Sequence, residues 1–360
     1  MNAESADISR STALAASQLR NGQPKRAVKT QRTQAGDQPA KQAALENSAI
    51  FRGLSLIAKL PLKRRRQLLR LCWRASLLIR KDVGFGLEPL LAQYLRISST
   101  EARIVAIEHD FHDILQIMEW ISGGLRNKQG IIADFNLMHT RDADLVERIA
   151  GTGDSVILAP MHMGIFPMGI SYMLWKYFPG RRVLVLRARE DHEENNAAMA
   201  RLREISSEVR ILNTRNEEDF MDAMRFARKG AVVISMVDLP ETYGKPVDTK
   251  IFGHDARIAF GLDAMARMLK AVVLPMTLRS GLSGDEILIG QPFEVWTNSK
   301  DDRGLLAGEV GKQIESFVKI DPCQWHMWTR ILEFFPGQQS APVAALTTSN
   351  EKGMASNEAA

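Results

Sequence analysis

The sequence contains little cysteine and no long apolar run. Its two cysteines, Cys72 and Cys323, lie far apart and form neither a CxxC pair nor a zinc-type spacing, so neither a disulfide framework nor a metal site is predicted. A reducing cytoplasm fits this pattern. The N-terminus lacks the apolar core of a secretory signal, and no stretch of about 18 apolar residues is present. A membrane-spanning segment is therefore not expected, whereas attachment to a membrane surface stays open.

Glycine-rich phosphate-binding motifs are also missing. Neither GxGxxG nor GxxxxGK[ST] occurs at the predicted strand ends, which disfavours dinucleotide and P-loop nucleotide binding. His109 and His112 lie on a predicted helix, where histidines are more often core or surface residues than ligands. No metal and no cofactor is expected.

Large apolar residues are scarce at both ends of the 360-residue chain. Residues 1–48 and 337–360 bury too little apolar surface to repay their ordering entropy and are predicted to be disordered tails. For the first tail, short helices that form on binding are the alternative. Between the tails we expect a basic amphipathic helical segment at 49–130 and an α/β domain at 131–336.

Acidic residues are absent from residues 51–81, a stretch that carries ten Lys or Arg. Pro61 suits the first turn of a helix, and Arg66, Arg70 and Arg74 follow at every fourth position. Apolar residues at helical spacing cover a different face: Leu68, Leu71, Cys72, Ala75 and Leu78. The pattern predicts a basic amphipathic helix whose three arginines contact anionic lipid headgroups or an acidic protein. The alternative is a core-packed helix with a solvated basic face. Few aromatics interleave and no groove-reading motif follows, so no nucleic-acid partner is expected.

From residue 131 onward, apolar strands alternate with helices. Strands are predicted at 155–160, 181–187, 209–213, 231–238 and 271–279, after two helices at 88–95 and 100–120. This alternation predicts an α/β fold with a mostly parallel sheet flanked by helices and with ligands at the carboxyl ends of the strands. His162, Arg187 and Asp238 all fall at such strand ends.

Six segments follow one another in an order that matches a known family pattern. They are VILAPMHMGIFPMG, VLVLRARED, ARLREIS, VVISMVDLPE, KIFGHDARIAFGLDAMARMLKAVVLPMTLR and DPCQWHMWTR. Over about residues 54–336 the chain resembles the bacterial lipid A biosynthesis (lauroyl/myristoyl) acyltransferases, which are related to the phosphatidylinositol mannoside acyltransferases. The first segment is similar to the family's apolar strand followed by His-Phe-Gly-Asn-Trp-Glu, and the last to its closing Pro-x-Gln-Trp-x-Trp-x-x-Arg.

The resemblance implies acyl transfer without a covalent enzyme intermediate. A fatty acyl group would pass from a thioester of acyl carrier protein or coenzyme A to a hydroxyl, or an amine, of a lipid, glycolipid or small-molecule acceptor. His162 matches the family histidine and would act as general base. The resemblance, together with the strand-end positions, gives the other site residues: catalytic Arg201 and Asp238, and substrate-binding Arg187, Arg189, Arg203, Gly164, Phe252 and Gly253.

Two departures from the family pattern leave alternatives open. The family places Glu or Asp five residues after the histidine, where this chain has Pro167, whose side chain cannot hydrogen-bond an imidazole. Either the histidine acts alone or is oriented by a carboxylate from Asp238, Glu190 or Asp191, or the acceptor is a more reactive amine, or the protein is a non-catalytic relative that binds acyl donor or lipid. The family's hydrophobic anchoring helix is interrupted here by KRRRQ, so we expect peripheral attachment to the inner face of the cytoplasmic membrane.

Overall fold

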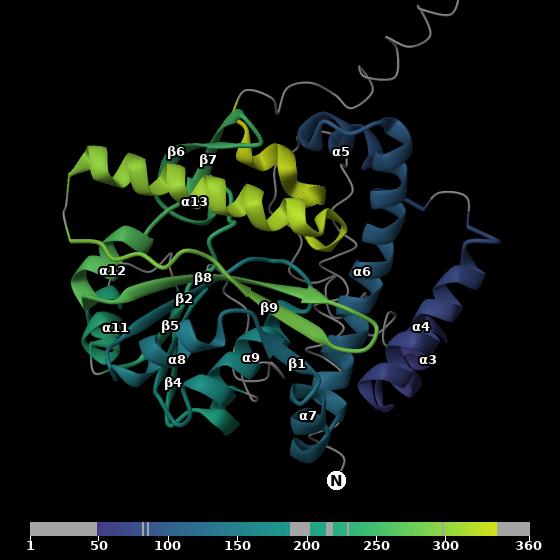
Figure 1. Ribbon diagram of the computed structural model, residues 1–360, viewed down its shortest axis with the longest axis horizontal. Coiled ribbons are helices and arrows are strands. Elements are labelled where there is room, and N and C mark those ends of the chain that lie inside the picture. Colours follow the sequence, from purple (N-terminus) through teal and green to yellow (C-terminus); the bar gives the residue numbers. More distant parts are fainter. Residues whose placement is uncertain are drawn as a thin grey trace, which may run out of the picture.

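The computed structural model describes residues 49–336, apart from 81–82, 85, 188–201, 214–218, 229 and 297–298. The predicted tails at 1–48 and 337–360 lie outside the described residues. Within this part the protein is α/β, with a mostly parallel sheet flanked by helices, as predicted (Figure 1).

The main sheet has seven strands in the order β1-β9-β8-β2-β5-β3-β4. Every neighbouring pair is parallel except β8 and β9, which are antiparallel. The strands are β1 (Met138–Thr140), β2 (Val156–Pro160), β3 (Val183–Arg187), β4 (Val209–Asn213), β5 (Val232–Ile234), β8 (Val272–Ser280) and β9 (Asp285–Ile289). The central position of β2 explains its uninterrupted apolar sequence, because both of its faces are covered.

Side chains of β2 alternate between two hydrophobic cores. Ile157 and Ala159 join the core formed with α11 (Phe220–Ala227), α12 (Leu262–Leu269) and α13 (Lys300–Ile320). Val156 and Leu158 join the opposite core, which includes α7 (Lys128–Phe135), α8 (Ala143–Gly151) and α9 (Phe166–Tyr177). Burial on both faces fixes the direction in which the strand delivers the next residues, including His162.

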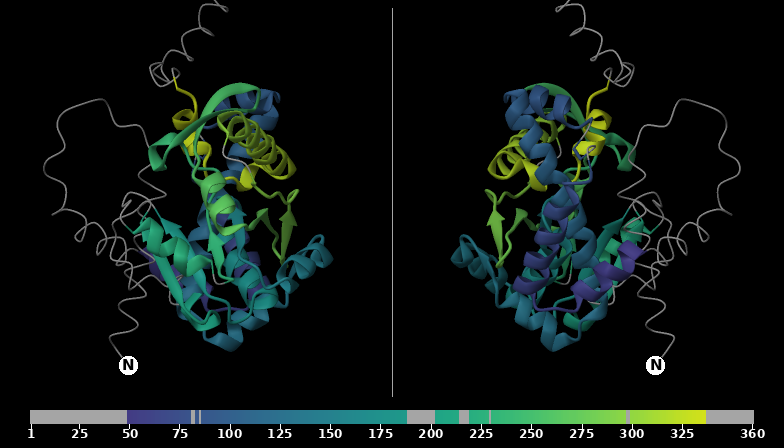
Figure 2. Two further views of the ribbon diagram at one scale, coloured as in Figure 1. Left: turned by 90° about the vertical axis from the view of Figure 1, so that its left-hand side faces the viewer. Right: turned by 90° about the vertical axis from the view of Figure 1, so that its right-hand side faces the viewer.

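The long helix α6 (Ser99–Leu125) contributes to both cores and carries the N-terminal helices on its side. Ser98 and Glu101 form a reciprocal capping box at its start. The predicted helix at 88–95 is confirmed as α5 (Glu88–Leu95), whereas α6 is longer at both ends than the predicted 100–120. Both α3 (Ala49–Ala58) and α4 (Leu62–Ser76) pack along α6 (Figures 1 and 2).

A two-stranded hairpin lies with α13 and α5 at one end of the molecule (Figures 1 and 2). It pairs β6 (Pro246–Ile251) with β7 (His254–Ala259), and its two turn residues, Phe252 and Gly253, have φ values of 54° and 78°. Positive φ at both turn positions is the signature of a type I′ hairpin turn. The 3₁₀ segments η2 (Glu241–Tyr243), η3 (Pro322–Gln324) and η4 (Trp328–Phe334) complete the described fold.

Candidate active site

The register of the central strands brings His162 next to Asp238. In the parallel pair, Leu158 of β2 lies opposite Ile234 of β5. Beyond β5 the pairing continues, because the Val237 N–H donates to the Pro160 carbonyl at 3.2 Å. His162, two residues after Pro160, and Asp238, the residue after Val237, then meet at the carboxyl edge of the sheet. The predicted strand at 231–238 is therefore shorter, and Asp238 lies in the loop after it.

Asp238 contacts both the imidazole and the backbone of His162. The Nδ1 nitrogen lies 2.8 Å from Asp238 Oδ1, and the backbone N–H of His162 donates to Oδ2 at 2.8 Å. The indole N–H of Trp325 also donates to Oδ2, at 2.8 Å. The Asp238 side chain is fully buried, whereas the His162 side chain is 23% exposed. One face of the pair is thus sealed and the other is open to a ligand.

These contacts select one tautomer of His162. Both groups that contact Asp238 Oδ2 are obligatory donors, so this carboxylate acts as an acceptor. The proton between the histidine and Asp238 therefore belongs to Nδ1, which leaves the lone pair on Nε2. An imidazole with a free Nε2 lone pair, oriented through Nδ1 by a buried carboxylate, is the arrangement that general-base catalysis requires.

Pro167 occupies the first turn of α9, where it takes no part in holding the imidazole. Its carbonyl accepts a hydrogen bond from the Ser171 hydroxyl, as part of the helix. The ring of the neighbouring Phe166 lies edge-on to His162, with centroids 5.0 Å apart. Of the three carboxylates considered as orienting groups, the structure brings Asp238 to His162, while Glu190 and Asp191 lie outside the described residues.

Backbone N–H groups of the loop after β2 are already engaged within the protein. The four donor–acceptor pairs are His162 to Asp238 Oδ2, Met163 to the Met161 carbonyl, Gly164 to the Gln324 carbonyl, and Ile165 to Ser280 Oγ. None of these four groups is available to a developing oxyanion without breaking its bond. An oxyanion donor must come from elsewhere.

Gly164, predicted to bind substrate, has a structural reason for being glycine. Its φ is +58°, and a Cβ on it would lie 2.4 Å from the Leu278 carbonyl oxygen. Its own carbonyl accepts a hydrogen bond from His326 Nε2 at 2.9 Å. Both of its backbone groups thus bond to the closing segment, at Gln324 and His326, while the absence of a Cβ permits the close approach to β8.

The closing segment contributes residues that sequence reasoning did not assign to the site. The His326 N–H donates to the His162 carbonyl at 2.8 Å, and Trp325 holds Asp238. His326 Nδ1 lies 2.8 Å from Asp113 on α6. The signal in the sequence was the match of DPCQWHMWTR to the family's closing motif. That match does not indicate that the segment contacts His162 and Asp238.

A group of titratable residues surrounds His326. Burial, followed by the charges of His326 and His109, lowers the pKa of His112 to about 3. Burial raises the pKa of Asp113, but the three neighbouring histidines outweigh that effect and lower it overall. Within the part of the chain that is described, no group of His, Cys, Asp and Glu has an arrangement that would hold a metal ion.

Of the four predicted site arginines, Arg187 and Arg203 lie among the described residues. Arg187 is the last residue of β3, at the same edge of the sheet as His162 but two strands away. Arg203 lies in a helical segment, 202–205, whose last residue accepts a hydrogen bond from the Gly180 N–H beside the start of β3. That is the opposite edge of the sheet, so its assignment to substrate binding is not supported. Arg189 and Arg201 lie outside the described residues.

Phe252 packs against the tryptophans of the closing segment. Its buried ring stacks on Trp328, with centroids 5.5 Å apart, and meets Trp325 at 6.0 Å. Trp325 in turn donates to Asp238, so the hairpin turn packs against the group that holds the carboxylate. The predicted direct contact of Phe252 with substrate is corrected to a packing role, while Gly253 is the exposed partner that completes the turn.

The three arginines expected on an outer face of α4 have different environments. Arg66 is completely buried and paired with Glu119 and Asp285, so its predicted membrane or acidic-partner contact is wrong. Arg70 pairs with Glu108 at 2.7 Å and lies over the rings of Trp73 and Phe111. Arg74 is exposed, as expected.

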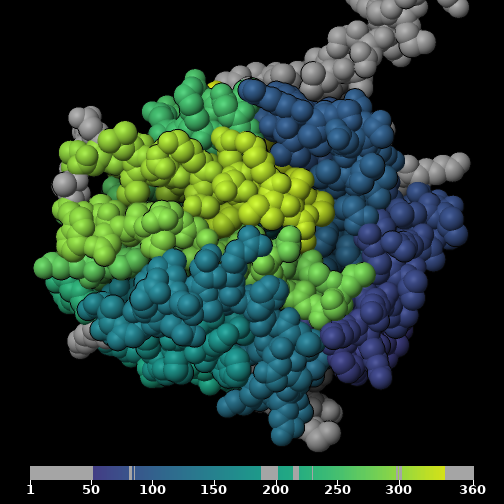
Figure 3. Space-filling model, viewed as in Figure 1, coloured from purple at the N-terminus to yellow at the C-terminus, as the bar shows by residue number. Residues whose placement is uncertain are grey.

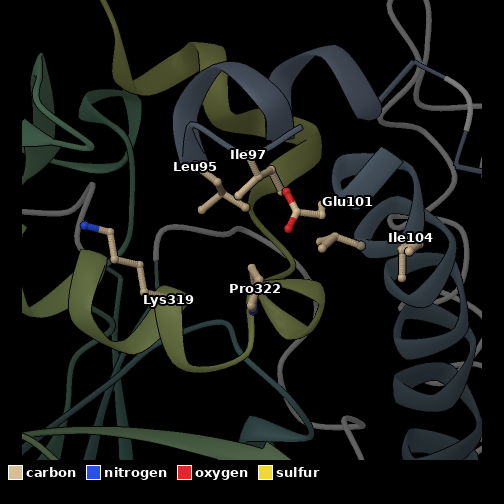
Figure 4. Close-up of a pocket in the computed structure, with 7 residues that line it drawn as sticks. Leu95, Ile97, Glu101, Ile104, Lys319 and Pro322 are labelled. Carbon is tan, nitrogen blue, oxygen red and sulfur yellow. The ribbon is translucent and has the colours of Figure 1, made fainter. Parts of the chain in front are cut away.

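A hollow lies between α5, α6, the end of α13 and the start of η3 (Figure 4). It has a volume of about 380 Å³ and is lined by Leu95, Ile97, Glu101, Ile104, Val105, Lys319 and Pro322. Its acidic member already caps α6, and its basic member pairs with Glu315. The lining thus has apolar surface but no group poised for proton transfer.

The described residues thus form a mostly parallel α/β sheet with His162 held by a buried carboxylate at its carboxyl edge. The sequence matches the model of the bacterial lipid A biosynthesis acyltransferases over residues 48–333, and the chain belongs to this family. Its class is therefore that of acyltransferases acting on lipid-like acceptors. A comparison with curated proteins gives no match. None of the helices in the described ranges combines the length and hydrophobicity needed to cross a bilayer.

Proposed function

We propose that this protein transfers a fatty acyl group from an acyl carrier protein or coenzyme A thioester to a hydroxyl, or an amine, of a lipid, glycolipid or small-molecule acceptor. The observation that carries the proposal is the hydrogen bond from Nδ1 of the partly exposed His162 side chain to buried Asp238, which leaves the lone pair on Nε2. Family membership supports the reaction class.

In the proposed mechanism His162 Nε2 takes the proton of the acceptor hydroxyl as its oxygen attacks the thioester carbonyl carbon. Asp238 stabilises the imidazolium that forms. The tetrahedral intermediate then expels the sulfur, which receives the proton from His162, so the products are an acyl ester and a free thiol. No covalent enzyme intermediate is required.

We assign the stabilisation of the developing oxyanion to an arginine side chain. The loop N–H groups beside His162 are engaged, and one well-placed donor contributes about 2.7–4 kcal/mol in characterised sites. Arg201, which matches the family arginine, is the proposed donor. Arg187, at the end of β3, and Arg189 are proposed to hold phosphate groups of donor or acceptor.

The proposed place of action is the inner face of the cytoplasmic membrane, with peripheral attachment. Lipid-like acceptors reside in a bilayer, and residues 51–81 carry basic groups without an acidic one. Electrostatic attraction to anionic lipids supports such attachment.

The test is a product search by mass spectrometry. Wild-type and His162→Ala protein are incubated with acyl carrier protein and coenzyme A thioesters of mixed chain length, together with bacterial lipid and small-molecule extracts. The proposal predicts an acylated product and released thiol with the wild type alone. Equal product with both proteins contradicts a role for His162.

Pro167 favours one second candidate, a non-catalytic relative that binds acyl donor or lipid. The family acid position is lost in this chain, and a binding protein does not need it. Such a protein would retain acyl thioester or lipid without turnover, and His162→Ala would bind it as tightly as the wild type does. Turnover by the wild type excludes this candidate.

A further inference from the structure

One face of α4 is buried against the rest of the protein and held there by ion pairs, so the opposite face points outward. Leu62, Leu69 and Trp73 are buried on the inner side together with Arg65 and Arg66. Arg65 pairs with Glu119 and with Asp134, and Arg66 with Glu119 and Asp285. A helix held by buried, charge-assisted pairs of this kind does not rotate freely.

The outer side of α4 and the turn after it carries an apolar stripe. Leu71 is 64% exposed, Leu78 88% and Ile79 84%, and Leu68 is exposed as well. Residues 64, 68, 71, 75 and 78 are spaced by three and four, so they lie along one helical face. Leu56 of α3 is 69% exposed too. Large apolar side chains gathered on one outer face indicate an interaction site rather than ordinary surface.

Basic side chains lie on this stripe, at Arg64, and beside it, at Lys63 and Arg74. Lys63, Arg64 and Arg74 are exposed, and no ion pair with another described residue includes them. The acidic residues that α6 presents nearby are already used, Glu108 by Arg70 and Asp110 by Arg80. The outer face therefore combines apolar residues with positive charge that the described protein does not neutralise.

We propose that the outer face of α3 and α4, defined by Leu56, Lys63, Arg64, Leu68, Leu71, Arg74, Leu78 and Ile79, docks on a bilayer that contains anionic lipid. This surface lies at the edge of the molecule beside α6 (Figure 3). The proposal rests on the proposed function in one respect, namely that the acceptor is a lipid held in a bilayer.

Charge argues for a lipid surface over a second copy of the chain. In a twofold dimer the same patch meets itself, so basic residues of one copy face those of the other. An anionic bilayer complements them, and the apolar stripe enters the boundary between headgroups and acyl chains. The surface would then hold the enzyme against the membrane that contains its acceptor.

The test measures binding of the full chain to vesicles by flotation, without acyl donor. Phosphatidylcholine vesicles are compared with phosphatidylcholine vesicles that contain phosphatidylglycerol. We expect binding to the anionic vesicles only, weakened by added salt. The Lys63→Gln/Arg64→Gln/Arg74→Gln variant should lose affinity on the order of 100-fold, at about fivefold for each basic group.

The Leu71→Gln/Leu78→Gln variant should lose at least about tenfold in affinity. Matched controls are Leu305→Gln on α13 and Arg225→Gln on α11, whose side chains are as exposed but lie elsewhere, and both should bind as the wild type does. All these sites are on the surface, so the variants are expected to fold.

Three results would overturn the docking proposal. They are absence of vesicle binding at any lipid composition, equal binding by the patch variants and the wild type, and a dimer that Leu71→Gln/Leu78→Gln dissociates. His162→Ala protein should bind vesicles normally. Failure of docking and failure of the chemistry are therefore separate outcomes.

Discussion

At the scale of residues, the site depends on one carboxylate with several donors. Asp238 receives hydrogen bonds from the ring and backbone of His162 and from the indole of Trp325. This carboxylate belongs to the loop after the neighbouring strand β5, and not to the helix that follows the histidine. Loss of the family acid at Pro167 is thereby compatible with an oriented base.

Asp238→Asn should lower kcat by up to about 10⁴-fold, as in the comparable serine-protease substitution. The amide can donate to Nδ1 and so favours the tautomer with the proton on Nε2, which cannot act as a base. Initial rates of thioester turnover, with KM determined separately, measure this effect. Near-wild-type kcat in a folded variant would show that Asp238 is not the orienting group.

Trp325→Phe should lower kcat by about 10- to 100-fold, because it removes a hydrogen bond to a charged group worth about 1.5–3 kcal/mol. The phenyl ring keeps most of the contact with Phe252, so KM should change little. Trp328→Phe is the matched control, since that indole donates to the Pro322 carbonyl and not to Asp238. Equal losses in the two variants would indicate a packing effect.

The free energy of unfolding should decrease as the pH is lowered, because His112 titrates at a lower pH in the folded protein than in the unfolded chain. Its pKa is lowered from the usual 6.5 to about 3 in the folded protein, so the unfolded chain binds more protons between these values. Lowering the pH from about 8 to about 5 should therefore remove about 2 kcal/mol of stability. Urea unfolding of wild type and His112→Gln measures the difference.

In that comparison, the His112→Gln variant should have the flatter dependence of stability on pH. Exposed His139→Gln serves as the control and should follow the wild type. Parallel curves for wild type and His112→Gln would contradict the buried, neutral state assigned to His112.

At the scale of elements, periodicity predicted the central strands and the helices at α4 and α5 because their apolar spacing is regular. It missed α13, whose sequence is mostly polar, and the β6–β7 hairpin, whose turn begins with Phe252 instead of Asn, Asp or Gly. It also assigned Arg66 to an outer face. That error arose because the partners of Arg66, Glu119 and Asp285, are distant in sequence and therefore invisible to helical spacing.

Glu119→Ala should destabilise the protein by about 3–5 kcal/mol, since it leaves Arg65 and Arg66 buried without their shared partner. Denaturant unfolding measures the change in the free energy of unfolding. Glu108→Ala, which removes the partly exposed partner of Arg70, should lower that free energy by no more than about 1 kcal/mol. Similar losses in the two variants would contradict a structural role for the buried network.

At the scale of the whole molecule, the site is assembled from three segments: the loop after β2, the loop after β5 and the segment between η3 and η4. His162 and Asp238 were both selected from the sequence because strand ends in parallel sheets converge. Their direct contact depends on the register of β2 and β5. The contribution of Trp325 depends on an isolated antiparallel β-bridge that pairs Met163 with Trp325. Neither is encoded in local sequence patterns, which is why the full constellation needed the structure.

The central claim is that His162, oriented by Asp238, is the base of an acyl transfer. The most direct measurement is the initial rate of thiol release from an acyl thioester in the presence of acceptor lipid, for wild type, His162→Ala and Asp238→Asn. The account predicts acceptor-dependent release by the wild type and a loss of several orders of magnitude in both variants, with unfolding midpoints that remain cooperative. Equal release by wild type and His162→Ala would contradict the account.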